Sequence, residues 1–149
     1  PVSAMLTRLL YASRSTRTID EPMIHEILEQ SREGNLEFGI TGVLCIDPAG
    51  GHFLQVLEGG RGVVNRLYAN VVKDPRHADV ELLHFEEIEE RHFSGWRMGT
   101  VDLTKVNRSI ILRFSESAAL DPYSLTGASA LALIDELTNT ASIFSREGH

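Results

Sequence analysis

The sequence lacks the residues that build disulfide frameworks and membrane spans. It has one cysteine among 149 residues, which excludes an internal disulfide and suits the reducing cytoplasm. No apolar run approaches the roughly 18 residues that a membrane span needs, and the N-terminus has no secretory signal pattern. We therefore predict a cytoplasmic protein without a membrane partner.

Positive charge is scarce as well. The chain has 14 Lys and Arg against 21 Asp and Glu, for a net charge of −7. Because binding to nucleic acid needs a basic face, we expect no nucleic-acid partner. The six histidines lack metal-ligand spacing, and Cys45 lies among apolar residues. We predict no metal site and a core position for the thiol.

The order of hydrophobic periodicities indicates one α+β domain. Alternating or short apolar segments predict strands at 6–13, 39–47, 52–59, 79–89 and 96–103, and helical stripes predict helices at 21–33 and 63–72. Asp20 and Pro22 are suited to begin the first helix, and Gly34 to end it. The resulting βαββαββ order predicts a ferredoxin-like mixed sheet with both helices on one face, over residues 5–103.

A two-helix extension is predicted for residues 104–144. Apolar residues at helical spacing mark its two helices: Val106, Ile110, Ile111 and Phe114, then Leu131, Ile134 and Leu137. These stripes are too apolar to face water, so they should cover the open sheet face or dock on a neighbouring subunit. We therefore expect a homo-oligomer, and we expect residues 145–149 to be a frayed tail.

One glutamine interrupts an otherwise apolar strand, "HFLQVLEG" at 52–59. A buried amide must satisfy two donors and two acceptor lone pairs, so Gln55 either faces solvent on an edge strand or contacts a flat polar ligand. Strand alternation places Phe53, Gln55 and Leu57 on one face and Leu54, Val56 and Glu58 on the other.

Six linked motifs resemble the BLUF domain, a blue-light sensor that uses FAD. They are "LYAS", "SREGN", "GITGVL", "FLQVLEG", "KDPRH" and "RHFSGWRM", in that order over about residues 6–102. The resemblance implies a short single-domain BLUF protein that is not an enzyme. Its sensor would be residues 5–103, its output cap 104–144, and it would signal to a separate effector protein.

The resemblance also implies where FAD binds, without a covalent bond, between the two helices. Tyr11 matches the photoactive tyrosine and Gln55 its amide partner, while Asn35 matches the residue that holds the pyrimidine edge of the flavin. Trp96 and Met98 match a pair on the last strand that changes with the signalling state. Because they are two residues apart, we expect them on one face.

The remaining residues expected around the flavin are of two kinds. Polar groups near the cofactor follow the second helix, where Asp74 would orient Arg76 and His77. Further neighbours would come from the first helix and from the third predicted strand: Ile24, Ile27, Ser31 and Leu57.

The cycle implied by the resemblance begins when blue light excites the flavin. An electron and then a proton leave Tyr11 through Gln55, and the amide ends rotated or tautomerised. Its hydrogen bonding to the flavin C4 carbonyl changes, and the absorption moves slightly to the red. The segment carrying Trp96 and Met98 would then pass the change to the tail.

Two other functions fit the predicted fold. One is a ferredoxin-like regulatory module that binds a small metabolite without photochemistry. The other is a small hydrolase of acylphosphatase-like topology, although the region of Asn35 has neither the phosphate cradle nor the arginine of such an enzyme. A purified protein that is yellow with oxidised flavin would exclude both.

Overall fold

A single mixed sheet organises the chain in the computed structural model, which describes the backbone of residues 5–140 and 143–145 and the side chains of 5–32 and 37–140. The sheet has six strands in the order β4-β1-β3-β2-β5-β6. The elements are β1 (Leu6–Ser15), α1 (Glu21–Phe38), β2 (Thr41–Asp47), β3 (His52–Gly60), α2 (Arg61–Lys73), β4 (His77–Ile88), β5 (Gly99–Asp102), α3 (Arg108–Leu112), α4 (Gly127–Thr140) and β6 (Ile143–Ser145), with short 3₁₀ turns at Leu103–Lys105 and Pro122–Ser124.

The first four strands have the ferredoxin-like arrangement that the sequence predicts. β1 pairs antiparallel with both β3 and β4, and β2 pairs antiparallel with β3. β5 then joins β2 in parallel, which makes the sheet mixed. The predicted α+β class and the placement of both helices on one face are confirmed.

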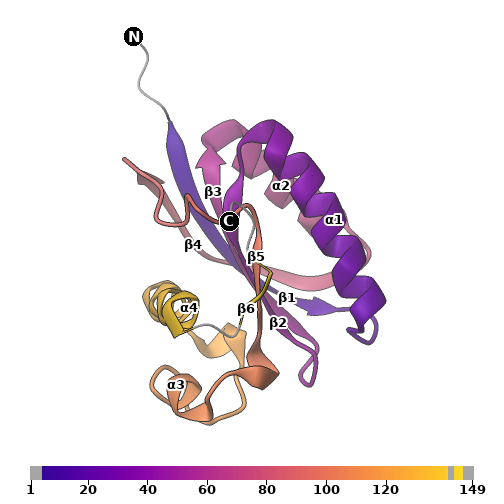
Figure 1. Cartoon of the computed structure of the whole chain (residues 1–149), viewed down its shortest axis with the longest axis vertical. Helices are drawn as coiled ribbons and strands as arrows, with labels where there is room; N and C mark the ends of the chain where they lie inside the picture. The colour runs from indigo at the N-terminus through magenta and orange to yellow at the C-terminus, as the bar shows by residue number, and fades with distance from the viewer. Residues whose placement is uncertain (1–4, 141–142, 146–149) are drawn as a thin grey trace.

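Each face of the sheet carries its own apolar layer. Helices lie on both sides of the sheet (Figure 1). α1 and α2 cover one face, where the core includes Leu9, Met23 and Val64. The tail, residues 103–140, covers the other face. We call the first the flavin-side face, because the family resemblance implies FAD between these two helices, and the second the tail-side face.

The end of α1 differs from the prediction. The Asp20 side chain accepts from the Met23 backbone N–H at 3.0 Å, as expected for a helix start. The helix, however, continues past Gly34 to Phe38, and Gly39 follows with φ of +69°. A glycine inside a helix costs only about 1 kcal/mol, which packing of α1 on the sheet offsets. Asn35 therefore lies within the helix rather than after it.

The last strand begins three residues later than predicted, at Gly99 instead of Trp96. Residues 96–98 are not extended: the Trp96 N–H donates to the Phe93 carbonyl at 3.0 Å in a turn, and β5 begins only at Gly99. A side chain at Gly99 would meet the Trp96 ring, with a Cβ 2.3 Å from its nearest atom. The turn and the ring packing override the strand propensity of this segment.

The tail docks on the tail-side face of the sheet. Its buried residues pack on the strands through Val106, Ile111, Leu120, Leu125, Ala130, Leu133, Ile134 and Leu137. Of the two docking modes that the sequence allowed, the structure shows the intramolecular one. β6 was not predicted: its Ser145 pairs with Thr100. Residues 146–149 lie outside the described residues, so the frayed tail stays a prediction.

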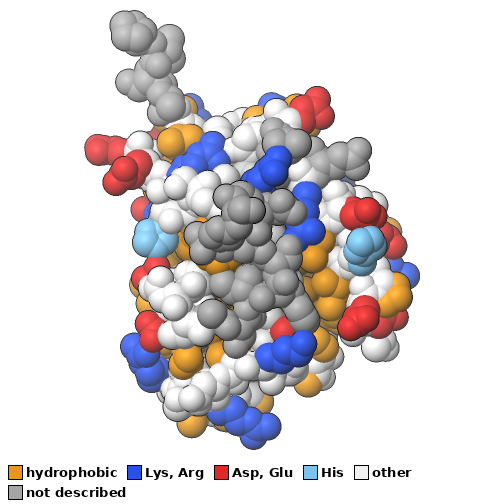
Figure 2. All heavy atoms as spheres, viewed as in Figure 1, with side chains coloured by type: hydrophobic (Ala, Val, Ile, Leu, Met, Phe, Trp, Pro, Cys, Tyr) orange, Lys and Arg blue, Asp and Glu red, His pale blue; other side chains and the backbone are white. Residues whose placement is uncertain are grey.

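The remaining composition-based expectations concern Cys45 and the surface. Cys45 is fully buried on the tail-side face, and burial raises the pKa of its thiol to about 12, as suits a core residue. None of the helices in the described part of the chain is long and apolar enough to cross a membrane. On the face shown in Figure 2, the Lys and Arg side chains form no continuous stripe.

Candidate functional site

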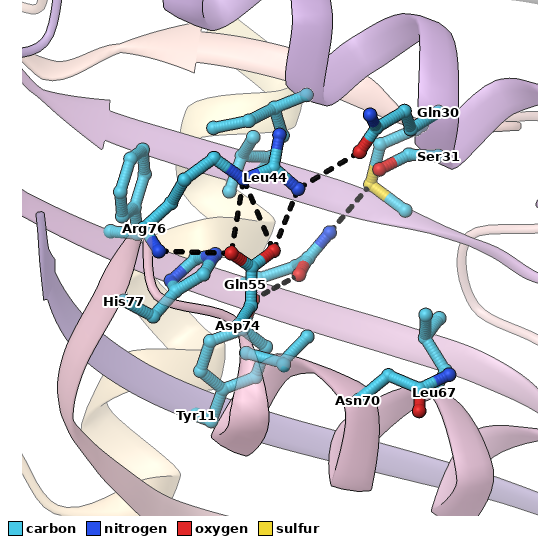
Figure 3. A pocket seen from close by; sticks show the side chains of 14 residues that line it. Tyr11, Gln30, Ser31, Leu44, Gln55, Leu67, Asn70, Asp74, Arg76 and His77 are labelled. Carbon is cyan, nitrogen blue, oxygen red and sulfur yellow. Dashed lines mark hydrogen bonds and ion pairs between the residues drawn. The ribbon is translucent and has the colours of Figure 1, made fainter.

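A cavity opens between α1 and α2 above the flavin-side face of the sheet (Figure 3). Its volume is about 190 Å³, below the roughly 300–1,000 Å³ typical of small-molecule sites. Its lining combines apolar walls with polar groups: Tyr11, Ile27, Gln30, Ser31, Leu44, Phe53, Gln55, Leu67, Asn70, Val71, Asp74, Arg76, His77 and Met98.

The floor of the cavity is a row of side chains that crosses the sheet. Tyr11 lies opposite Gln55, Gln55 opposite Leu44, and Leu44 opposite Thr100. Residues that are paired across neighbouring strands point to the same face, so the whole row faces the helices. Gln55 therefore does not face solvent, and only 6% of it is exposed.

Both the oxygen and the nitrogen of the Gln55 amide form hydrogen bonds. Its Oε1 accepts a hydrogen bond from the Tyr11 hydroxyl at 2.5 Å, and its Nε2 donates to the Met98 Sδ at 3.2 Å. Thioether sulfur is only a weak acceptor, so the second bond is the easier one to give up. The amide thus connects a phenol on β1 with a thioether just before β5.

Burial controls the ionisation of Tyr11. The phenol is fully enclosed, and its desolvation, followed by the nearby Asp74 carboxylate and Tyr68 phenol, raises its pKa above the ordinary value. The Tyr68 ring lies 5.7 Å away and the His77 ring 6.3 Å away, measured between ring centroids. Tyr11 therefore keeps its proton and acts as a hydrogen-bond donor.

Arg76 spans the mouth of the cavity from the end of α2 to α1 (Figure 3). Its guanidinium binds Asp74 at 2.6 Å, and it also donates to Glu26 at 3.0 Å and to Gln30 at 2.9 Å. The side-chain hydrogen bond from Arg76 lowers the pKa of Asp74, although burial opposes it. Asp74 thus orients Arg76, whose guanidinium is engaged with two carboxylates and the Gln30 amide where it lines the cavity.

His77 follows Arg76 as the first residue of β4, and it also lines the cavity. One ring nitrogen, Nδ1, shares a 2.8 Å hydrogen bond with the Ser13 hydroxyl, and the ring packs on Phe53 with centroids 5.1 Å apart. Burial lowers its pKa, while Asp74 opposes this effect. The residue therefore presents a neutral imidazole to the cavity near neutral pH.

The structure brings together most of the residues predicted for the site. Those that line the cavity are Tyr11, Ile27, Ser31, Gln55, Asp74, Arg76, His77 and Met98. Ile24 and Leu57 lie on the flavin-side face but not on the cavity lining. The side chain of Asn35 lies outside the described residues, so its predicted contact stays a prediction.

The prediction that Trp96 and Met98 lie on one face of the sheet is wrong. Trp96 belongs to the tail-side core and Met98 to the flavin-side core, so the two do not share a face. The rule that residues two apart point the same way holds only in an extended strand, and this segment turns before β5. Among the described residues, Met98 contacts the Gln55 amide and Trp96 does not line the cavity.

Sequence reasoning missed several lining residues: Gln30, Leu44, Phe53, Leu67, Asn70 and Val71. Phe53 and Leu44 carried a usable signal, since strand alternation and hairpin pairing place both on the Gln55 face. Gln30 and Asn70 are polar residues on largely exposed helix faces. Nothing in the local sequence separates them from solvated residues.

One buried hydroxyl in the cross-strand row has no hydrogen-bond partner among the described residues. Thr100 is fully buried and its Oγ1 is unpaired, so Thr100→Val should raise the free energy of unfolding by about 1 kcal/mol. Urea denaturation measures the change. Thr7→Val is the matched control, because the equally buried Thr7 hydroxyl donates to the Gly59 carbonyl at 3.3 Å and its loss should destabilise. Equal destabilisation by both variants would contradict the expectation.

The sequence and the structure both match proteins of one family. The family model for BLUF, described as sensors of blue-light using FAD, matches residues 6–99. The photoactivated adenylate cyclase subunit beta of Euglena longa is 35% identical over 88 residues, which are 59% of this chain and 10% of that protein. The blue light- and temperature-regulated antirepressor BluF of Escherichia coli K12 is 32% identical over 124 residues, which are 82% of this chain and 30% of that protein. The chain thus spans a minor part of these relatives.

Two solved structures resemble almost the whole chain. The photo-activated state of BlsA superposes with a TM-score of 0.77 at 31% identity, covering 89% of this chain and 94% of that one. The dark-state structure of BlrB, described as a BLUF protein, gives 0.76 at 29% identity, covering 93% and 98%. The similarity therefore extends beyond the sheet into the tail.

Proposed function

This chain belongs to the BLUF family of blue-light sensors, and we propose that it binds FAD non-covalently and signals through a rearrangement of the Gln55 hydrogen bonds. The observation that carries this proposal is the buried chain of hydrogen bonds from Tyr11 through Gln55 to Met98. The phenol, the amide and the thioether all line the same cavity.

The lining of the cavity suits the chemistry of a flavin ring. A tricyclic ring has flat apolar faces and a polar edge, and the lining combines the apolar side chains of Ile27, Leu44 and Leu67 with the Gln55 amide. Tyr11, Gln55, Ser31 and Asn70 are the described polar residues that would hold the ring.

FAD rather than FMN is supported by a second compartment that continues from the first. It lies between the same helices, shares Gln30, Ser31, Leu67 and Asn70 with the first, and is also lined by Phe38, Ile40, Val63 and Arg66. Arg66 offers a guanidinium suited to a diphosphate, and the apolar side chains offer a surface for an adenine. Flavin released from purified protein and separated by chromatography distinguishes the two cofactors.

The protein's own residues would perform the proton and electron steps. A bound flavin would absorb the blue light and, once excited, would itself be the oxidant. Tyr11 would give up one electron to this oxidant and then its phenolic proton, which would pass to Gln55 Oε1 along the existing hydrogen bond. The return of the electron and the proton to Tyr11 would leave Gln55 rotated or tautomerised.

Rotation of the amide has a direct consequence for Met98. The Met98 sulfur now accepts from Gln55 Nε2, and a rotated amide would present Oε1 to it instead. Two acceptors cannot hydrogen-bond to each other, so the thioether loses its partner and must move. We expect the light-induced change to leave the site through the segment that carries Met98.

The output of this chain is proposed to act on a separate effector protein, with no enzymatic activity of its own. The names of the relatives describe different outputs, an adenylate cyclase in Euglena and an antirepressor in Escherichia coli. The described residues after the sensor form a cap on the sheet. We also propose that the cap carries the signal; the homo-oligomeric state and the cytoplasmic location stay predictions.

A light-minus-dark absorption spectrum of the purified protein tests the proposed function. The expected result is a yellow protein whose flavin absorption moves reversibly to the red under blue light. A colourless protein, or a yellow one without a reversible shift, would contradict the proposal. The first of these results would favour the metabolite-binding alternative.

The response should be insensitive to alkaline pH. An exposed tyrosine ionises at a pH of about 10, whereas burial raises the pKa of Tyr11 above that value. The phenol therefore keeps its proton, and the size of the red shift should stay constant from about pH 7 to about pH 10. Spectra recorded across this range measure it. A loss of amplitude with a midpoint near the ordinary tyrosine pKa would show that the phenol is not shielded.

A further inference from the structure

β4 is an edge strand, and its outer side has no partner strand among the described residues. β1 occupies its inner side. The tail reaches the backbone of β4 by a hydrogen bond only at Asp79, whose carbonyl accepts from the Tyr123 hydroxyl at 2.7 Å. Over residues 80–88, which we call the β4 edge, no described group outside β1 forms a hydrogen bond with the backbone. Open backbone of this kind is a template for a further strand.

Two apolar side chains are exposed along the β4 edge. Leu82 is 48% exposed and Phe85 is 40% exposed. Each lies opposite a β1 residue of the flavin-side core, so both point to that face of the sheet. Leu83, between them, is unpaired where the register with β1 shifts, and this β-bulge puts two residues that are three positions apart on one face. The edge therefore offers an apolar contact next to open backbone.

Carboxylates dominate the same part of the chain. Residues 78–90 contain six of them and neither Lys nor Arg: Asp79, Glu81, Glu86, Glu87, Glu89 and Glu90. Arginines of β1 and α2 pair with three of these side chains. Glu81, near the middle of the strand, is exposed and has no ion pair or hydrogen bond among the described residues. An added strand would therefore meet negative charge that the protein does not neutralise.

This charge decides which strand can be added. Two copies of the β4 edge side by side would bring the carboxylates of both onto one ladder, with no Lys or Arg in either strand to offset them. Like charges opposite each other in a ladder are destabilising, whereas opposite charges stabilise the pair. The edge thus disfavours a second copy of this chain. It favours a strand that carries Lys or Arg together with apolar residues.

We propose that the β4 edge is a docking site for an extended segment of a partner protein in which Lys or Arg alternates with apolar residues. The segment would add a seventh strand to the six of the sheet, cover Leu82 and Phe85, and bring a cation opposite Glu81. The contact involves neither flavin nor light, so it goes beyond the proposed function. Only the identification of this partner with the effector rests on that function.

The test uses the flavin-loaded full chain in the dark and a synthetic peptide of alternating Val and Lys. At a peptide concentration ten times its Kd, amide hydrogen exchange over residues 80–88 should slow about tenfold, because these amides would exchange only when the peptide is released. A peptide in which Pro replaces each Val has the same charge but lacks every second N–H. This control peptide should leave the exchange unchanged.

Glu81→Lys tests the charge complementarity, with Glu116→Lys as the matched control. Both variants reverse one exposed carboxylate and change the net charge equally, but Glu116 lies on the tail, away from β4. Glu81→Lys should raise the Kd of the Val–Lys peptide about fivefold, the upper range for one cross-strand charge pair. Glu116→Lys should leave the Kd unchanged.

Three results would overturn the inference. The first is exchange at 80–88 that the Val–Lys peptide does not slow, or that the Pro–Lys peptide slows equally. The second is an equal loss of affinity in Glu81→Lys and Glu116→Lys, which would show attraction to net charge alone. The third is exchange at 80–88 that slows with protein concentration when no peptide is present, since this would assign the edge to a second copy. Absence of a red shift would instead contradict the proposed function, so the two failures are distinguishable.

Discussion

Gln55→Leu is expected to abolish the light-induced red shift while the protein still binds flavin. Leucine occupies a similar volume but cannot accept from Tyr11 or donate to Met98, so both bonds of the amide are lost. The rearrangement of these bonds is the proposed signalling event, and without an amide it cannot occur. The buried Tyr11 hydroxyl also loses its acceptor, which should lower the free energy of unfolding by about 1–3 kcal/mol.

Gln30→Leu is the control for this prediction. It makes the same substitution at the other glutamine of the cavity, whose Oε1 accepts from Arg76 rather than from Tyr11. Light-minus-dark spectra should show the red shift in Gln30→Leu and none in Gln55→Leu. A normal shift in Gln55→Leu would exclude the amide as the switch.

Tyr11→Phe is expected to have an effect of similar size by a different route. Phenylalanine retains the ring but has no proton to transfer and is far harder to oxidise, so flavin should bind while the red-shifted state does not form by the normal path. Gln55 Oε1 would also lose the donor that now lies 2.5 Å away. Spectra under blue light, with flavin content as the reference, measure this outcome.

Tyr68→Phe is the corresponding control. Its ring packs 5.7 Å from that of Tyr11, between centroids, and it comes from α2 rather than from the floor of the cavity. The shift should survive in Tyr68→Phe. A photocycle in Tyr11→Phe equal to that of the parent would place the electron donor elsewhere. Trp96 packs in the tail-side core and does not line the cavity.

Elements with strong local signals were predictable. The two hairpin strands alternate or run apolar on either side of a Gly-containing loop, and the observed β2 and β3 match the predictions closely. The boundaries that failed depend on packing. α1 passes through Gly34 and ends at Phe38, and the segment before β5 turns at Trp96. In both cases tertiary contacts outweigh local preferences of about 1 kcal/mol.

The candidate site, like the fold, has features that local sequence patterns predict and features that depend on long-range contacts. The order of the motifs and the residues that share a face with Gln55 could be predicted from the sequence, because the motifs are linear and strand alternation is local. By themselves these determined the fold class and the resemblance to the family, and the resemblance implied the pairing of Tyr11 with Gln55. The sequence could not show that Arg76 bridges two helices or that Gln30 and Asn70 line the cavity, since these contacts join residues far apart in the chain.

Only the tertiary structure decided how the sensor connects to its tail. The sequence placed Trp96 and Met98 on one face because it treated their segment as a strand; the turn sends one to each side of the sheet. Glu58 looks like a polar residue at a strand end, yet folding buries it against two backbone amides that are 34 and 35 residues away. A buried carboxylate is stable only where such partners converge, and that convergence is a property of the folded chain rather than of any local stretch of it.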